Sequence, residues 1–163
     1  MKNSAKESSE KLKILVAEEN QEACSALEEL LKVLGHSVMV TQDGEDALNM
    51  FHETIPDLVF SGLTLPKLGG MELLREVKSG SGKTLFVMIC PMSDPEKIQQ
   101  ALKKGAADFL TRPIQSRELI RSLDRLVNLK KGFIASPMVN ETTPDPENVE
   151  LNPPQGEWRK ELI

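Results

Sequence analysis

Four residues with reactive or charged side chains stand at the ends of short aliphatic runs. Two carboxylates, Glu18 and Glu19, follow the first run, the thiol of Cys90 closes a later one, and Arg112 follows the last. A guanidinium presents a planar fork of donors that suits a carboxylate, and a thiol reacts once its pKa is lowered. We therefore expect an ion pair between Arg112 and one of the glutamates, with a solvated Arg112 as the alternative. For Cys90, a small buried residue is the first interpretation, and a redox-sensitive thiol with a pKa lowered by Arg112 is the second.

These residues belong to an alternation of strand and helix signals. Short aliphatic or β-branched runs predict strands at Leu12–Ala17, Ser37–Thr41, Leu58–Ser61, Leu85–Cys90 and Asp108–Thr111. The segments between them carry apolar residues at helical spacing. Because three of the runs are almost continuously apolar, they are typical of parallel strands covered on both faces. The pattern predicts a doubly wound α/β domain, with a five-stranded parallel sheet and helices on both faces.

In such a sheet the functional crevice lies at the carboxyl ends of the strands. The residues at those ends are Glu18, Glu19, Gly62, Cys90 and Arg112. Gly62 is the one position among them without a side chain.

Composition excludes several classes of protein. Apolar residues make up 39% of the 163 residues, which is enough for a core. A net charge of −5, with five Phe, one Trp and no Tyr, argues against binding to nucleic acid or to an anionic membrane. No apolar run is long enough to span a membrane. The two cysteines cannot form a disulfide framework, so we expect a reducing, cytoplasmic compartment.

Charge and proline content change near Gly132. Residues 132–163 carry six acidic against two basic residues and hold five of the ten prolines. We predict a disordered N-terminus at 1–10, a folded domain at 11–131, and an acidic, Pro-rich linker or tail at 132–163. The apolar residues at the end of this tail either begin a further output region, which is the first interpretation, or form a docking peptide.

Four stretches in order resemble the receiver domain of response regulators, the CheY-like phosphorylatable module of two-component signalling. They are KILVAEEN, TQDGEDALNMF, PDLVFSGLTLPKLGG and KKGAADFLTRPI, and the resemblance extends from Lys11 to Lys131. It implies strand order 2-1-3-4-5 and a signalling module that is not an enzyme.

The departures from the family pattern are specific. Gly62 stands where the family has the phosphoacceptor Asp, Cys90 where it has Thr or Ser, and Arg112 where it has Lys. Glu18 and Glu19 replace an acidic pair that, with the acceptor Asp, holds Mg²⁺. The resemblance therefore implies a degenerate receiver without a catalytic residue or cofactor, and Mg²⁺ at the two glutamates belongs only to the alternative of an atypical, phosphorylatable regulator.

Neighbouring residues do not replace the missing acceptor. Side chains alternate along a strand, so Ser61 is expected to point away from the crevice, and Asp57 lies too far along the chain. Phe109 matches the aromatic residue that switches in the family, but without a hydroxyl partner we expect it only to pack in the core. The bond between Arg112 and Pro113 matches one that is often cis in the family.

The last two predicted helices carry basic residues that are candidates for partner binding: Lys97, Lys104, Arg117, Arg121 and Arg125. Spacing places the three arginines opposite the apolar stripe of the last helix. An ordinary solvated face is one interpretation. The other is that the fourth helix, fifth strand and fifth helix dock a protein partner or a second copy. We expect a phosphorylation-independent regulatory module, with a phosphorylatable regulator or a small-molecule sensor as alternatives.

Overall fold

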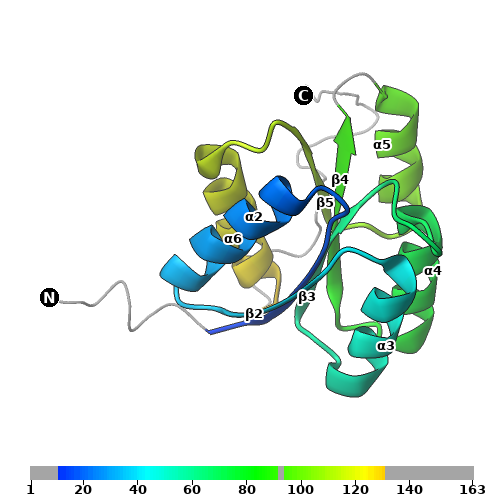
Figure 1. The fold of residues 1–163 in the computed structure, drawn as a ribbon, viewed down its shortest axis with the longest axis horizontal. Coiled ribbons are helices and arrows are strands. Elements are labelled where there is room, and N and C mark those ends of the chain that lie inside the picture. The colour runs from blue at the N-terminus through cyan, green and yellow to red at the C-terminus, as the bar shows by residue number, and fades with distance from the viewer. Residues whose placement is uncertain (1–10, 92–93, 131–163) are drawn as a thin grey trace, which may run out of the picture. The chain divides into compact units, whose positions relative to one another are not determined.

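A computed structural model describes residues 11–91 and 94–130, and they form a parallel sheet between two helical layers (Figure 1). The sheet order is β2-β1-β3-β4-β5, so the predicted fold class and strand order are confirmed. The strands are β1 (Lys13–Ala17), β2 (Ser37–Thr41), β3 (Leu58–Gly62), β4 (Leu85–Pro91) and β5 (Asp108–Arg112). The helices are α2 (Gln21–Val33), α3 (Gly44–Thr54), α4 (Gly70–Gly80), α5 (Pro95–Lys103) and α6 (Ser116–Lys130).

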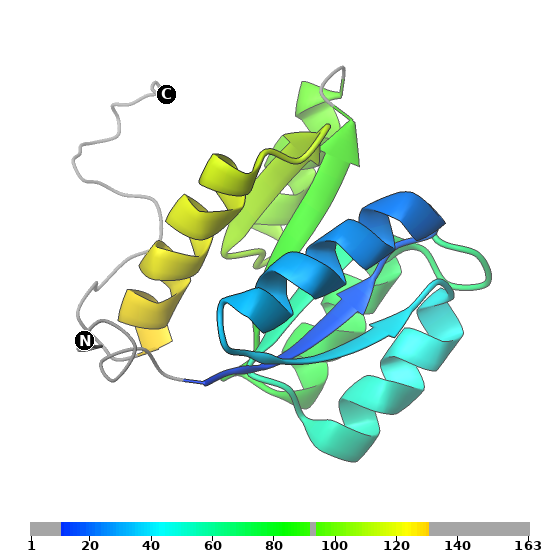
Figure 2. The same cartoon turned by 60° about the vertical axis from the view of Figure 1, so that its left-hand side comes forward.

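The helices divide between the two faces of the sheet. Figures 1 and 2 show α2 and α6 on one face and α3, α4 and α5 on the other. Among the described residues, those up to Leu126 form one compact unit, and residues 127–130 at the end of α6 belong to a second. The predicted disordered segment 1–10 and linker 132–163 lie outside the described residues. No helix within residues 11–91 and 94–130 is long and apolar enough to cross a membrane.

The main core lies between the sheet and helices α3, α4 and α5. Phe51 of α3, Leu74 of α4 and Phe86 and Met88 of β4 are fully buried there. Every residue of β3 is buried, which explains why its sequence is apolar without alternation.

Strand register decides which side chains reach the opposite face. Ala17 pairs with Ser61, Gly62 with Ile89 and Pro91 with Arg112. Because side chains alternate along each strand, Gly62 and Arg112 face α2 and α6. The residue that follows Ala17, Glu18, continues the alternation toward the same side.

Two glycines permit close packing around the loop after β3. A Cβ at Gly44 would lie 1.8 Å from the carbonyl oxygen of Leu68, and one at Gly70 would lie 2.2 Å from that of Gly62. Only glycine fits these approaches, so the N-termini of α3 and α4 hold the loop in place beside the crevice.

The two edge strands differ in charge. β5 begins with Asp108 and ends with Arg112, whereas β2 has the sequence SVMVT and carries no charge. Residues Val38 to Thr41 are each half-buried.

Candidate functional site

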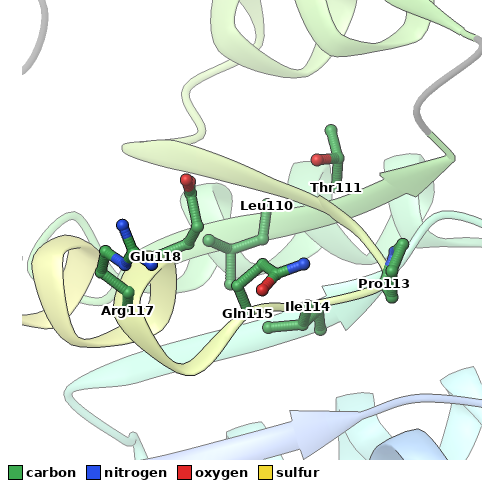
Figure 3. A pocket seen from close by; sticks show the side chains of 7 residues that line it. All are labelled: Leu110, Thr111, Pro113, Ile114, Gln115, Arg117 and Glu118. Carbon is green, nitrogen blue, oxygen red and sulfur yellow. The ribbon is translucent and has the colours of Figure 1, made fainter.

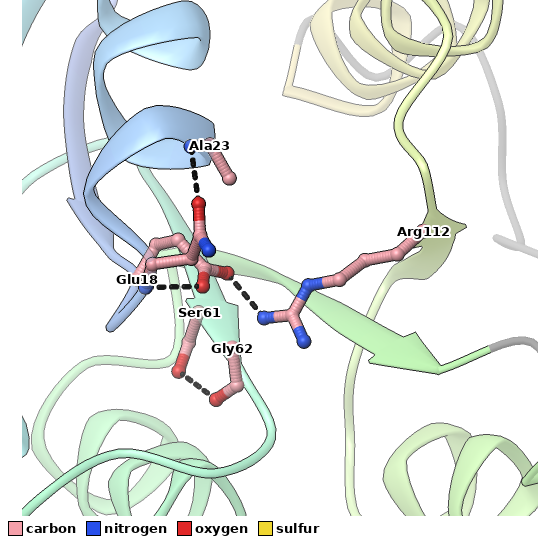
Figure 4. Close-up of polar contacts among 6 residues, drawn as sticks. Glu18, Ala23, Ser61, Gly62 and Arg112 are labelled. Atoms are coloured by element: carbon pink, nitrogen blue, oxygen red, sulfur yellow. Dashed lines mark hydrogen bonds and ion pairs between the residues drawn. The ribbon is translucent and has the colours of Figure 1, made fainter.

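An ion pair occupies the crevice at the carboxyl ends of β1, β3 and β5. Nη2 of Arg112 donates a hydrogen bond to Oε1 of Glu18 at 2.6 Å, and the Glu18 side chain is fully buried (Figure 4). The backbone N–H of Asn20 donates to the other oxygen, Oε2, at 2.9 Å. The predicted contact between Arg112 and a glutamate is therefore present, and Glu18 is the glutamate that makes it.

The contact is a single hydrogen bond rather than a bidentate fork. Nε of Arg112 is buried and has no hydrogen-bond partner among the described residues. The Arg112 side chain keeps 34% of its surface exposed. Water can therefore reach part of the guanidinium, whereas the carboxylate depends entirely on protein donors.

Local structure at the start of α2 fixes the carboxylate. The Glu18 N–H donates to the carbonyl of Thr41 at 3.1 Å, which continues the pairing of β1 with β2 past the strand end. Asn20 is the N-cap of α2, and its side chain accepts from the Ala23 N–H at 2.8 Å. Capping by Asn satisfies a free helical donor and turns the chain at this point, so Glu18 is held between the end of a strand and the first turn of a helix.

Gly62 leaves space for the ion pair. A Cβ at this position would lie 3.1 Å from Oε1 of Glu18 and 3.3 Å from Nη2 of Arg112. Both distances are tighter than ordinary van der Waals contact, so any side chain here would press on the two charged groups. The ion pair therefore depends on the absence of a side chain at position 62.

The residues of the crevice do not fit Mg²⁺. This ion needs about six oxygen ligands in near-octahedral geometry. Both oxygens of Glu18 already accept hydrogen bonds, Gly62 offers no carboxylate, and the exposed Glu19 lies outside the pair. No group of three potential ligands from His, Cys, Asp and Glu is found in the described part of the chain.

Cys90 lies on the other face of the sheet, in the core with α4 and α5. Burial raises the pKa of its thiol to about 11, Asp94 adds to the rise, and Arg112 opposes it. At neutral pH the thiol is protonated, which disfavours a redox-sensitive Cys90 and favours the inert buried residue. Burial also raises the pKa of Cys24, and Glu18 and Glu28 add to this effect.

Ser61 and Asp57, the two neighbours considered from the sequence as alternative acceptors, do not reach the crevice. Ser61 is buried, and its hydroxyl donates to the carbonyl of Gly62 at 2.9 Å (Figure 4). A carboxylate oxygen of Asp57 accepts from the Lys13 N–H at 2.8 Å, at the beginning of β1 and the opposite end of the sheet.

The segment after β5 carries a cis peptide bond between Arg112 and Pro113. Beside it lies a hollow of about 390 Å³, which Figure 3 shows between the β5 residues Leu110 and Thr111 and the start of α6. Arg117, a predicted partner-binding residue, lines this hollow. Phe109 is half-buried and lies outside the main core cluster, so its packing is looser than expected.

The basic residues divide into two groups. Lys97, Lys104, Arg117 and Arg121 are exposed. The expectation that Arg125 shares their solvated face is wrong, because its Nη2 donates to the carbonyl of Ala107 at 2.9 Å and its side chain is half-buried. Residues four apart on a helix are rotated by about 40°, so Arg125 is turned about 80° from Arg117, toward the side on which Ser122 and Leu126 are buried.

Comparison with known proteins decides the family. The model of the response regulator receiver domain matches residues 14–124. The chain belongs to the response-regulator receiver family. Over 121 residues it is 31% identical to a probable transcriptional regulator, ycf27, of Guillardia theta, and this match covers 72% of the chain and 47% of the relative. The chain thus spans about half the length of that relative.

Solved receiver structures agree with the fold. A receiver domain protein from Clostridium thermocellum is 27% identical with a TM-score of 0.70, over 75% of this chain and 98% of that one. The receiver domain of NtrX from Brucella abortus is 28% identical with a TM-score of 0.68, over 71% and 98%. The family connects this chain to two-component signalling.

Sequence reasoning missed the part that Asn20 plays. Its backbone N–H holds the second oxygen of Glu18 while its side chain caps α2. The signal was available, because an Asn directly before a helical pattern is a common N-cap.

Proposed function

We propose that this chain is a degenerate receiver that regulates by binding other proteins, without phosphorylation, enzymatic activity or a cofactor. The observation that carries the proposal is the crevice itself. Gly62 cannot attack a phosphoryl group, and the Glu18–Arg112 pair fills the space beside it.

The ion pair supports a fixed state. In a phosphorylatable site, a cation and an incoming phosphoryl group change the charge of the crevice. Here one cationic side chain and one buried carboxylate of the chain itself are joined by a hydrogen bond of 2.6 Å. Because this contact needs no input, we infer that β5 keeps one position relative to β1.

Intact-mass measurement tests the chemistry. The full chain is incubated with Mg²⁺ and phosphoramidate, a small donor that transfers only phosphoryl groups, and we expect an unchanged mass. The double variant Gly62→Asp/Arg112→Lys, run in parallel, restores the side chains that the family has at these positions. A phosphoryl adduct on the unaltered chain would overturn the proposal in favour of an atypical phosphorylatable regulator.

Exposed basic residues support a docking surface along β5. Figure 1 shows that α5 and α6 lie on opposite faces of the sheet, so their basic residues flank the β5 edge. Lys97 and Lys104 belong to α5 and its C-cap, and Arg117 and Arg121 to α6. Oε2 of Glu118 lies 3.9 Å from Nη1 of Arg121, a loose contact that leaves the guanidinium available. We infer that this surface binds an acidic protein surface, or a second copy of the chain.

Charge reversal tests the surface. Arg117→Glu and Arg121→Glu together should weaken the complex captured from native cell extract at least tenfold. Arg75→Glu is the matched control, because Arg75 is an exposed arginine on α4 whose nearest acidic group, on Glu76, is 3.6 Å away. Equal loss with the control would remove the proposed surface and leave an ordinary solvated face.

A further inference from the structure

A groove of about 930 Å³ runs along α2, opposite the segment from Arg112 to Leu119. It lies wholly within the compact unit Met1–Leu126. Its apolar lining includes Ala23, Ala26, Leu27 and Leu30 on α2, with Ile114 and Leu119 across from them. A concave, mainly apolar site of this size is typical of small-molecule binding.

Two alanines create the hollow. Ala23 and Ala26 lie about one turn apart on the same side of α2, and their short side chains leave Leu27 and Leu30 as the floor. Leu27 is 3% exposed, whereas Val33, which continues this apolar face, is 79% exposed, so the groove opens to solvent at the C-terminal end of α2. An apolar hollow that is open to solvent at one end is accessible to a ligand.

The charges around the groove select the ligand. Glu19, Glu22 and Glu29 line it and are exposed, and none of them forms an ion pair with another described residue. Arg112 is the only cation in the lining, and Glu18 already neutralises it. The groove therefore presents a net negative rim above an apolar floor, which complements a ligand with cationic groups and an aliphatic body.

The spacing of two of these carboxylates sets the length of that ligand. Glu22 and Glu29 are seven residues apart, which is two turns and about 10 Å along the helix axis. Ala26 lies between them and leaves space for a methylene chain. We propose that the groove binds an extended aliphatic diamine, with one ammonium at Glu22, the other at Glu29, and the chain over Ala26 and Leu30.

The groove ends at the ion pair. Asn20 and Arg112 both line it, and both donate to the Glu18 carboxylate. A ligand seated along α2 therefore lies beside both donors, and signals from Arg112 should respond to binding.

Titration of the full chain with 1,8-diaminooctane, followed by NMR, tests the proposal. We expect saturable shifts at Ala26, Leu30 and Arg112. Octylamine lacks the second charge and 1,4-diaminobutane is too short, so each should bind about threefold or more weakly. Glu22→Gln and Glu29→Gln should each weaken the diamine about threefold, and added salt should weaken it further. Glu45→Gln removes one exposed carboxylate on α3 and should change nothing.

Ala26→Trp provides a second test. Position 26 is exposed, so the variant should keep its circular dichroism spectrum while the indole fills the groove and abolishes binding. Absence of saturable binding, or equal binding by octylamine, would overturn the proposal. The proposal would also be overturned if the unaltered chain sedimented as a dimer and Ala26→Trp dissociated that dimer, because the groove would then bind a second copy of the chain. None of these results depends on whether the chain accepts phosphate.

Discussion

The Glu18–Arg112 pair makes a quantitative prediction about stability. Arg112→Met removes the cation and leaves a fully buried carboxylate with the Asn20 N–H as its remaining donor. Breaking a wholly buried pair from one side costs about 3–5 kcal/mol. Because the Arg112 side chain is 34% exposed and makes one hydrogen bond, we discount this figure and expect about 2 kcal/mol.

The reverse change should cost less. Glu18→Gln keeps the shape of the side chain and removes its charge, while the exposed part of the guanidinium can turn to water. We expect about 1 kcal/mol for this variant. The double variant has no stranded charge, so it should lose about 2 kcal/mol rather than the sum of the two losses.

Urea unfolding followed by far-ultraviolet circular dichroism measures these changes. The signal reports the helices of the domain, whereas the single tryptophan, Trp158, lies outside the described residues. Glu19→Gln is the matched control and should stay within about 0.5 kcal/mol of the unaltered chain, because Glu19 is exposed. Losses that add within about 0.5 kcal/mol in the double variant would refute the coupling on which the proposed function depends.

Gly62, Cys90 and His36 offer three further tests. Gly62→Ala should lower the free energy of unfolding by about 1 kcal/mol, because its methyl would stand 3.1 Å from Oε1 of Glu18; unchanged stability in urea would contradict this. The Cys90 pKa rises from 9.0 to about 11 on folding. As the pH rises, the unfolded chain therefore loses the thiol proton before the folded chain does. Between these two pH values the free energy of unfolding should fall by roughly 1.4 kcal/mol per pH unit. This slope should flatten in the variant Cys90→Ala. An equal slope in that variant would exclude the thiol as its cause. Nδ1 of His36 accepts the Leu12 N–H at 3.1 Å, and burial lowers its pKa from 6.5. The stability that neutral His36 contributes is thus complete above pH 6.5 and is lost as the pH falls. A titration midpoint of His36 at or above 6.5, measured by NMR in the folded protein, would contradict the lowered pKa.

The fold was predictable because its signals are local and repeat along the chain. Each apolar run became a strand, and the helices lie where the helical spacing placed them. The strand ends differ from the prediction: β1 begins one residue later, at Lys13, and β3, β4 and β5 each extend one residue further, to Gly62, Pro91 and Arg112. Glycine and proline are depleted in strands, and a charged residue does not continue an apolar run, but pairing with the neighbouring strand keeps the backbone extended through all three positions.

The candidate site was predictable in its members but not in all of its geometry. The choice between Glu18 and Glu19 could have been made from alternation, since Glu18 continues the phase of Ile14 and Val16 toward α2. The same reasoning places Cys90 on the opposite face from Gly62. The groove along α2 could not have been predicted, because its far wall comes from a segment about 90 residues later in the chain.

The uncharged edge of the sheet has a consequence for concentrated samples. The Ser37 N–H donates to the carbonyl of Leu12, and the carbonyl of Thr41 accepts from Glu18, so these two residues face β1. By alternation, Val38 and Val40 turn their own N–H and carbonyl groups outward. Exposed edge strands in natural proteins commonly carry lysine or proline, which prevent such pairing. The sequence of β2, SVMVT, contains neither. At high concentration, the outward backbone groups of β2 can pair with the same strand of another molecule. Any self-association at this edge should therefore be directional, with the sheet continuing from one molecule into the next.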